Sequence, residues 1–240
     1  MSDQNTGYQP PPVAIHPAGH GHTPHHPYLQ HHFDNMAQQM EASTLGMWTF
    51  LVTEIMFFGG LFMAYLVYRH QSPQGFQEAS HHLNVFWGTL NTALLIISSL
   101  TMALAVRAAQ TSQPAKTQVM WLVSTMILGA GFLGIKAIEY TEKFRDHIVP
   151  GPYFQWEGVY PKPAEQFYSL YFAMTGLHAL HMVIGLGLMT VITIMAWKKQ
   201  FDREYYTPVE VSGLYWHFVD IVWIFLFPLL YLIGRHYHAG

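Results

Sequence analysis

Five long apolar segments separated by short polar ones dominate the chain from residue 44 onward. They cover residues 44–68, 84–106, 118–140, 166–197 and 212–233. Each can cross about 30 Å of hydrocarbon, which takes roughly 20 helical residues. Only helices and closed barrels satisfy all backbone hydrogen bonds in lipid. The pattern therefore predicts an all-α fold, a polytopic membrane helical bundle with five transmembrane helices.

The N-terminal segment, residues 1–43, has a different character. It is polar, contains Pro10-Pro11-Pro12 and has few large apolar residues. Because such a segment cannot build a core, we expect a disordered tail followed by one membrane domain over residues 44–240. Metal chelation, proton buffering and a merely solvated tail are all compatible with its histidines. Those histidines are His16, His20, His22, His25, His26, His31 and His32.

Composition supports a membrane protein and narrows the chemistry. Charged residues make up 10% of the chain and hydrophobic residues 51%, whereas soluble domains carry about 25% charge. The chain has no cysteine, so disulfides and thiolate metal sites are excluded. It also has no basic run or basic face, so we expect no nucleic-acid partner.

Positive charge divides evenly between the two sides of the predicted bundle. The side of the N-terminus carries Arg107, Lys116, Lys198, Lys199 and Arg203. The opposite side carries Arg69, Lys143, Arg145, Lys162 and Arg235. Short loops weigh most in the positive-inside rule, and Lys198-Lys199 abuts a helix end. This favours a cytoplasmic N-terminus.

An acidic residue in the first predicted span and another in the third need explanation. Glu54 lies near the middle of the first span, where a carboxylate is costly and marks a functional site or a strong packing contact. We keep both interpretations, a proton- or lipid-linked network and a hydrogen bond to a neighbouring helix. Glu139 follows Lys136 by three residues near the end of the third span. This spacing predicts an ion pair, with Lys136 reaching toward the membrane interface.

Histidines raise the question of a metal or haem site. His178 and His181 lie three residues apart in the fourth span, and His217 lies in the fifth. Haem in a helical bundle takes axial ligands from facing helices, and no second pair at matching depth is evident. We therefore expect no metal-binding, cofactor-binding or catalytic residue on this chain, and interpret these histidines as buried hydrogen-bonding groups.

The fifth span carries a polar pair and a proline. His217 and Asp220 share a helix face because they are three residues apart. We expect them to form an internal tie that holds this span in the bundle. Pro228 removes one backbone donor and predicts a local kink near Ile224.

Several segments resemble subunit III of the haem–copper cytochrome c oxidases. They are LGMWTFLVTEIMFFGGLFMAY (45–65), LNTALLIISSLTMALA (90–105), GIKAIEY (134–140), YFAMTGLHALHMVIG (171–185) and YWHFVDIVWIFLFPLLYLIG (215–234). They occur in the family's order and cover nearly all the spans. The family's buried polar residues then correspond here to Glu54, Glu139, His178, His181, His217 and Asp220.

Two differences from the family pattern stand out. The best-known members have seven spans, and the first two are absent here. The lipid cleft that those helices help to form is therefore in question, although five-span bacterial forms occur. Ala179 also replaces the glycine often found between the two histidines.

The resemblance implies a non-catalytic subunit of a proton-translocating oxidase in aerobic electron transport. It would pack beside catalytic subunit I and subunit II in the bacterial inner membrane, and contact membrane lipids. Haem and copper would lie on those partner subunits. Cytochrome c would interact with this chain only indirectly, through the complex. Structural phospholipid could bind to this chain. The subunit would support proton uptake and the stability of subunit I. Alternatives are a quinol oxidase, a nitric-oxide-reductase-associated complex, a free-standing proton-coupled transporter and a membrane cytochrome.

Overall fold

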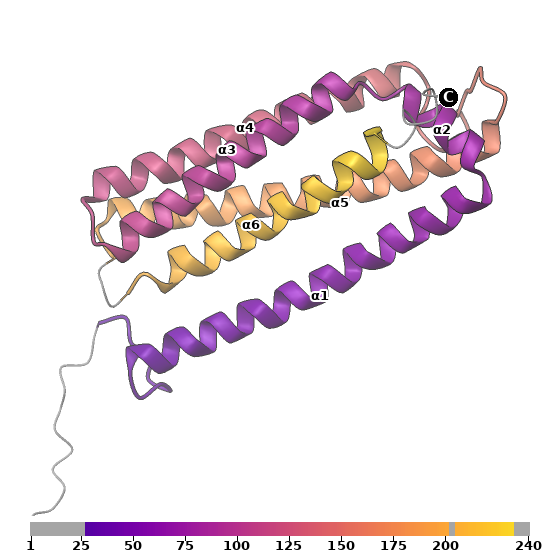
Figure 1. Cartoon of the computed structure of the whole chain (residues 1–240). Coiled ribbons are helices and arrows are strands. Elements are labelled where there is room, and N and C mark those ends of the chain that lie inside the picture. The colour runs from indigo at the N-terminus through magenta and orange to yellow at the C-terminus, as the bar shows by residue number, and fades with distance from the viewer. Residues whose placement is uncertain (1–26, 202–204, 233–240) are drawn as a thin grey trace, which may run out of the picture.

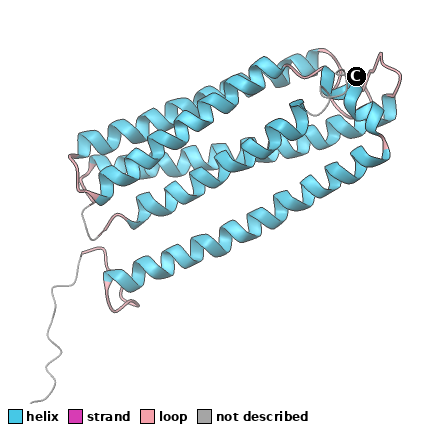
Figure 2. Cartoon of the chain, in the orientation of Figure 1, coloured by secondary structure: helices cyan, strands magenta, loops and turns pink. Residues whose placement is uncertain are grey.

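The computed structural model describes residues 27–201 and 205–232 as a bundle of long helices. The helices are α1 (Met36–Gln71), α2 (Pro73–His81), α3 (Val85–Gln110), α4 (Ala115–Arg145), α5 (Pro161–Trp197) and α6 (Thr207–Phe227), followed by a π-helical turn, Pro228–Leu232. Figure 2 shows helices and loops only in this part of the chain. Five helices are long and apolar enough to cross a membrane, which confirms the predicted fold class.

The helices begin at residues that suit a helix start. The side chain of Asn35 accepts a hydrogen bond from the Gln38 amide at the start of α1. Asn84 does the same for Phe86 in α3. Such caps satisfy amides that have no partner within the helix. Pro161 stands in the first turn of α5, where its missing amide costs nothing.

The first helix is longer than expected, because α1 starts at Met36 rather than at residue 44. The segment just before it forms turns, and the ring of Tyr28 stacks on that of Tyr205 at 4.7 Å between centroids. Residues 27–43 of the expected tail therefore form turns and the first part of α1. The remainder, residues 1–26 with five of its seven histidines, lies outside the described residues.

Helix α6 is the central element of the bundle. It contacts α3, α5 and α1, while α4 packs on α3 and α5. Figure 1 shows α1 at one edge, alongside α6. In the apolar stretch of α6 and its π turn, 56% is buried within the chain, whereas only 17% of the corresponding stretch of α1 is buried. Most of the surface of α1 therefore faces away from the rest of the chain.

Two glycines allow the large side chain of Trp216 to fit in the core. A Cβ on Gly129 of α4 would lie 2.7 Å from the Trp216 ring, and one on Gly185 of α5 would lie 3.1 Å from it. Trp216 itself is fully buried. Close approach of helices at small residues is the usual packing mode in lipid. The Trp216 indole thus fills a space that any side chain at Gly129 would occupy.

Pro228 changes the helix type at the end of the last span. The α-helix continues through Ile224 to Phe227, and the π-helical turn follows at Pro228–Leu232. The departure from regular α geometry therefore falls beyond the expected site near Ile224. Proline cannot donate to the preceding turn, and the wider π turn carries Leu230 and Tyr231 into the core.

Candidate functional site: polar groups within the membrane bundle

Glu54 of α1 is paired with a histidine of α5. Its Oε2 lies 3.2 Å from Nε2 of His181, and the Nδ1 of that ring lies 2.8 Å from the carbonyl oxygen of Leu177. If Nδ1–H donates to this carbonyl, Nε2 and the carboxyl group share a single proton. Either a carboxylic acid faces a neutral imidazole, or a carboxylate faces an imidazolium. The contact ties α1 to α5, as the packing interpretation of Glu54 expected.

His217 and Asp220 do not form the expected pair. Nδ1 of His217 lies 2.7 Å from Oγ of Ser99 on α3, whereas neither carboxyl oxygen of Asp220 has a hydrogen-bond partner within the described ranges. The prediction of an internal His–Asp tie was therefore wrong. Sharing a helix face brings two side chains to the same side, but the Ser99 hydroxyl offers His217 a partner across the helix interface.

Helix α3 supplies further hydroxyl groups to α6. The Trp216 indole donates to Ser98 Oγ at 2.9 Å, and the Trp223 indole donates to Thr92 Oγ1 at 3.1 Å. Neither contact was predicted from the sequence. A buried indole N–H usually finds an acceptor, so the hydroxyl residues of the second span were the available signal.

A second polar cluster, named here the Lys136 cluster, joins α4 and α5 to the π turn. Nζ of Lys136 donates to Glu139 Oε2 at 2.8 Å and to the Tyr231 hydroxyl at 2.7 Å. Tyr231 donates in turn to Glu139 Oε1 at 2.5 Å, and the Tyr171 hydroxyl lies 3.4 Å from the same oxygen. The predicted Lys136–Glu139 ion pair is present.

The surroundings of Lys136 differ from the expectation. Its side chain is only about 4% exposed, so the ammonium is buried within the bundle and does not extend outward from it, as the expectation required. The ammonium lies 4.6 Å from the ring centre of Trp223 and 5.2 Å from that of Tyr231, as in cation–π contacts. Sequence reasoning missed the role of Tyr231, because its inward position follows from the π turn.

His178 occupies an aromatic part of the core. Its ring lies 5.3 Å from Phe132 and 5.2 Å from Trp223, between centroids. Its Nε2 has no hydrogen-bond partner among the described residues. We expected all three histidines to form hydrogen bonds. His181 and His217 do so, whereas Nε2 of His178 does not within the described part of the chain. Across the described chain, no three His, Cys, Asp or Glu side chains gather as a metal site would need.

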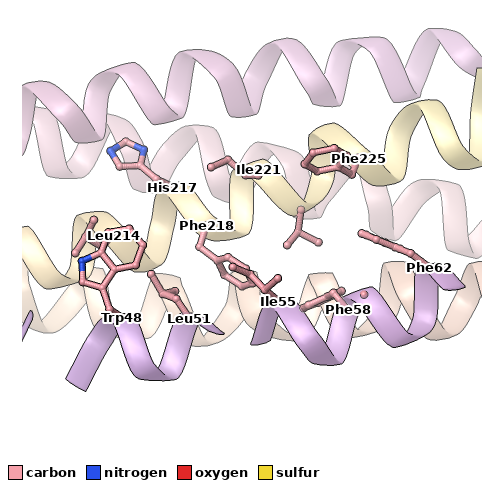
Figure 3. Close-up of a pocket in the computed structure, with 12 residues that line it drawn as sticks. Trp48, Leu51, Ile55, Phe58, Phe62, Leu214, His217, Phe218, Ile221 and Phe225 are labelled. Atoms are coloured by element: carbon pink, nitrogen blue, oxygen red, sulfur yellow. The ribbon is translucent and has the colours of Figure 1, made fainter. Parts of the chain in front are cut away.

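Two grooves open on either side of α6. The first lies between α1 and α6, measures about 450 Å³, and is almost entirely apolar. Figure 3 shows side chains of α1, such as Ile55 and Phe58, facing Phe218 and Phe225 of α6 across it. The second groove lies between α3 and α6, measures about 360 Å³, and contains Asp220.

The fold and these contacts define a polytopic helical membrane protein in which several buried polar side chains bond across helix interfaces of the same chain. Residues 27–235 match the family model described as cytochrome c oxidase subunit III. The match covers most of the 240 residues. The chain belongs to the cytochrome c oxidase subunit III family.

Named relatives span oxidases with different electron donors. The chain is 30% identical over 213 residues to quinol oxidase subunit 3 of Bacillus subtilis, covering 86% of this chain and 97% of the relative. It is 31% identical over 205 residues to cytochrome bo(3) ubiquinol oxidase subunit 3 of Pseudomonas aeruginosa, covering 85% and 91%. It is 32% identical over 206 residues to cytochrome c oxidase subunit 3 of Thermostichus vulcanus, covering 84% and 92%.

Proposed function

We propose that the chain is the non-redox subunit III of a bacterial haem–copper oxidase that takes part in aerobic electron transport and proton translocation. It packs on the catalytic subunit I of the complex, next to subunit II. Haem and copper belong to those partners, and this chain supports proton uptake and the stability of subunit I. Membership of the subunit III family supports the assignment to an oxidase complex.

One structural observation carries the supporting role. Several titratable groups in the spans bond to other helices of the same chain, as in Glu54–His181, His217–Ser99 and Lys136–Tyr231. Groups already bonded in this way stabilise helix packing, since interhelical hydrogen bonds help to hold membrane bundles together. This arrangement suits a subunit that supports a neighbour.

For the electron donor we propose cytochrome c, acting through the other subunits of the complex. Quinol is the second candidate, because two of the three relatives above are named as quinol or ubiquinol oxidase subunits, and the third as a cytochrome c oxidase subunit. Oxygen consumption by the purified complex decides between them. Turnover with reduced cytochrome c supports the first, whereas turnover with quinol alone supports the second.

The apolar groove between α1 and α6 suits a phospholipid acyl chain. Its walls are side chains such as Leu51, Phe62 and Val222, within the membrane-spanning parts of both helices. Burying apolar chain against apolar walls needs no polar partner. We propose that structural phospholipid binds there.

A pair of adjacent glycines provides the test of lipid binding. Gly59 lines this groove, and a Cβ added to it would meet no atom within 4 Å. A Cβ on Gly60 would also meet nothing within 4 Å, but Gly60 does not line the groove. We expect Gly59→Leu to reduce the phospholipid that copurifies with the complex, measured by mass spectrometry, and Gly60→Leu to leave it unchanged. Equal lipid content in the two variants contradicts the proposal.

We place the chain in the bacterial inner membrane with a cytoplasmic N-terminus. The loop that contains Lys198 and Lys199 supports this orientation, because basic residues next to a helix end favour the cytoplasmic side. Labelling of a cysteine introduced at Ser112, in the loop on the same side, with a membrane-impermeant reagent tests it. Labelling in intact cells contradicts the orientation.

Purification of the tagged chain from native membranes tests the function as a whole. We expect a haem-bearing subunit to copurify and the complex to reduce oxygen. A chain that purifies alone overturns the proposal and favours the free-standing transporter. Removal of the chain from the complex is expected to leave initial oxygen reduction in place and to shorten the active lifetime. A lifetime that does not change contradicts the supporting role.

A further inference from the structure

The groove between α3 and α6 differs from its neighbour in having a polar floor. Its walls are formed by Ile96, Leu100 and Ala103 of α3 and by Ile221 and Ile224 of α6. These residues recur every three or four positions, so each helix lines the groove along one face. Ile96 and Leu100 are 55% and 60% exposed, and the groove therefore opens outward from the bundle.

Asp220 lies at the base of this groove, and its carboxyl oxygens accept no hydrogen bond from the described residues. Its side chain is about 2% exposed, and both carboxyl oxygens lack a partner among residues 27–201 and 205–232. It stands near the centre of the 26-residue span Thr207–Leu232. A span of this length that is centred in the bilayer places the carboxyl group roughly 15 Å from either headgroup region. A carboxyl group at this depth needs a donor.

We propose that the α3–α6 groove is the docking site for a transmembrane helix of the catalytic subunit, and that this helix places a hydrogen-bond-donating side chain on the Asp220 carboxyl group. The proposal rests on the function proposed above and specifies the face of the chain that meets its partner. A donor such as a hydroxyl, an indole N–H or a basic group fits the unmet acceptors of Asp220.

The chemistry of the groove favours a helix over a lipid as its occupant. An acyl chain has no donor, and a headgroup does not reach the centre of the membrane. The neighbouring groove between α1 and α6 contains no such unpaired carboxyl group, since its lining is almost entirely apolar. Only the α3–α6 groove therefore requires a polar partner at this depth, within the part of the chain that the structure describes.

The shape of this face also suits a packed helix. His217 and Ile221 line both grooves, so the two grooves lie side by side with α6 as a ridge between them. Helices pack by inserting the ridge of one into the groove of another. The exposed Ile221 and Ile224 on this ridge add apolar surface that a partner helix would bury.

Photo-crosslinking in the intact complex tests the docking face. A benzophenone amino acid replaces Ile96 or Ile224 at the rim of the groove, and Ile127 or Val183 as controls on α4 and α5. All four side chains are 45% to 66% exposed. We expect adducts with a haem-bearing subunit from the two rim positions, and none from the controls.

Other outcomes overturn the proposal. Adducts with lipid alone at the rim show that lipid fills the groove, and adducts with a second copy of this chain show self-association. Equal adducts at the rim and control positions show that the groove is not the docking site. If the chain copurifies with a haem-bearing subunit but its rim gives no adduct to that subunit, the docking face fails while the proposed function stands. A chain that purifies alone overturns both.

Substitution of Asp220 tests the hydrogen bond itself. We expect Asp220→Leu to speed loss of the chain from the complex in detergent at least about tenfold, the factor for one hydrogen bond to a carboxyl group. Asp220→Asn keeps an acceptor and is expected to have a smaller effect. An unchanged rate for Asp220→Leu overturns the proposal. If that variant does not accumulate in membranes, the crosslinking result with Asp220 intact decides.

Discussion

Nδ1 of His217 lies 2.7 Å from Oγ of Ser99, across the interface between α6 and α3, and not against Asp220 one turn further along α6. Ser99, His217 and Asp220 all line the groove between α3 and α6. One polar residue of the last span is thus bonded within the chain, and the other is left for a partner.

The first prediction concerns the His217–Ser99 contact. Ser99→Ala removes the hydroxyl, and we expect it to destabilise the subunit by about 0.6–1.7 kcal/mol, the range for interhelical hydrogen bonds in membranes. The measurement is the thermal midpoint at which the subunit leaves the purified complex. Ser124→Ala is the matched control, because that hydroxyl is exposed and bonds only to its own helix. Equal midpoints for the two variants contradict the prediction.

The second prediction concerns the Lys136 cluster. Lys136→Met leaves the Glu139 carboxylate without its cation in the core, and we expect a loss of about 3–5 kcal/mol, as for one partner of a buried ion pair. Glu139→Gln is expected to be similarly harmful. Each single variant leaves the remaining charge without its partner. The double variant should therefore lose less stability than the sum of the losses of the two single variants.

The measurement for this cycle is chemical or thermal unfolding of the subunit in the complex. Lys116→Met in the exposed first turn of the same helix is the control, and it should have little effect. Additive losses in the double variant would show that the two charges act independently, contrary to their 2.8 Å contact.

The third prediction uses two glycines of α4. A Cβ on Gly129 would lie 2.7 Å from the Trp216 ring, whereas one on Gly134 would meet nothing within 4 Å. Since overpacking of a close-packed core costs about 1–3 kcal/mol, we expect Gly129→Ala to lower the yield of assembled subunit and its thermal midpoint. Gly134→Ala should match the wild type, and a Gly129→Ala variant as stable as Gly134→Ala would count against the tight fit of Trp216.

The sequence was informative where one physical effect dominated. Five apolar runs of spanning length predicted the five helices, because lipid leaves the backbone few alternatives. The short helix α2, with the sequence PQGFQEASH, was missed because its residues are mixed in polarity. The start of α1 at Met36 was missed because the residues before 44 are polar and carry no apolar pattern.

Partners across helix interfaces were harder to predict than the helices. Spacing of three correctly indicated the Lys136–Glu139 pair, which lies within one helix. The same spacing gave a wrong pair for His217, because spacing alone does not show that Ser99 of α3 lies within reach. Tyr231 joined the Lys136 cluster through the π turn after Phe227, which no periodicity in the sequence indicates.

The last prediction concerns Glu54, whose carboxyl group lies 3.2 Å from Nε2 of His181. Glu54→Gln can still donate its amide hydrogen to Nε2 of a neutral His181, so we expect the subunit to assemble normally. Since Glu54 supports and does not contact the reacting groups in our proposal, oxygen reduction should fall by less than about tenfold, or ~1.4 kcal/mol in the barrier. Oxygen consumption and subunit retention are the measurements, with Glu41→Gln on the exposed first part of α1 as control. Complete loss of oxygen reduction in a fully assembled Glu54→Gln complex would assign this residue a direct part in proton delivery instead.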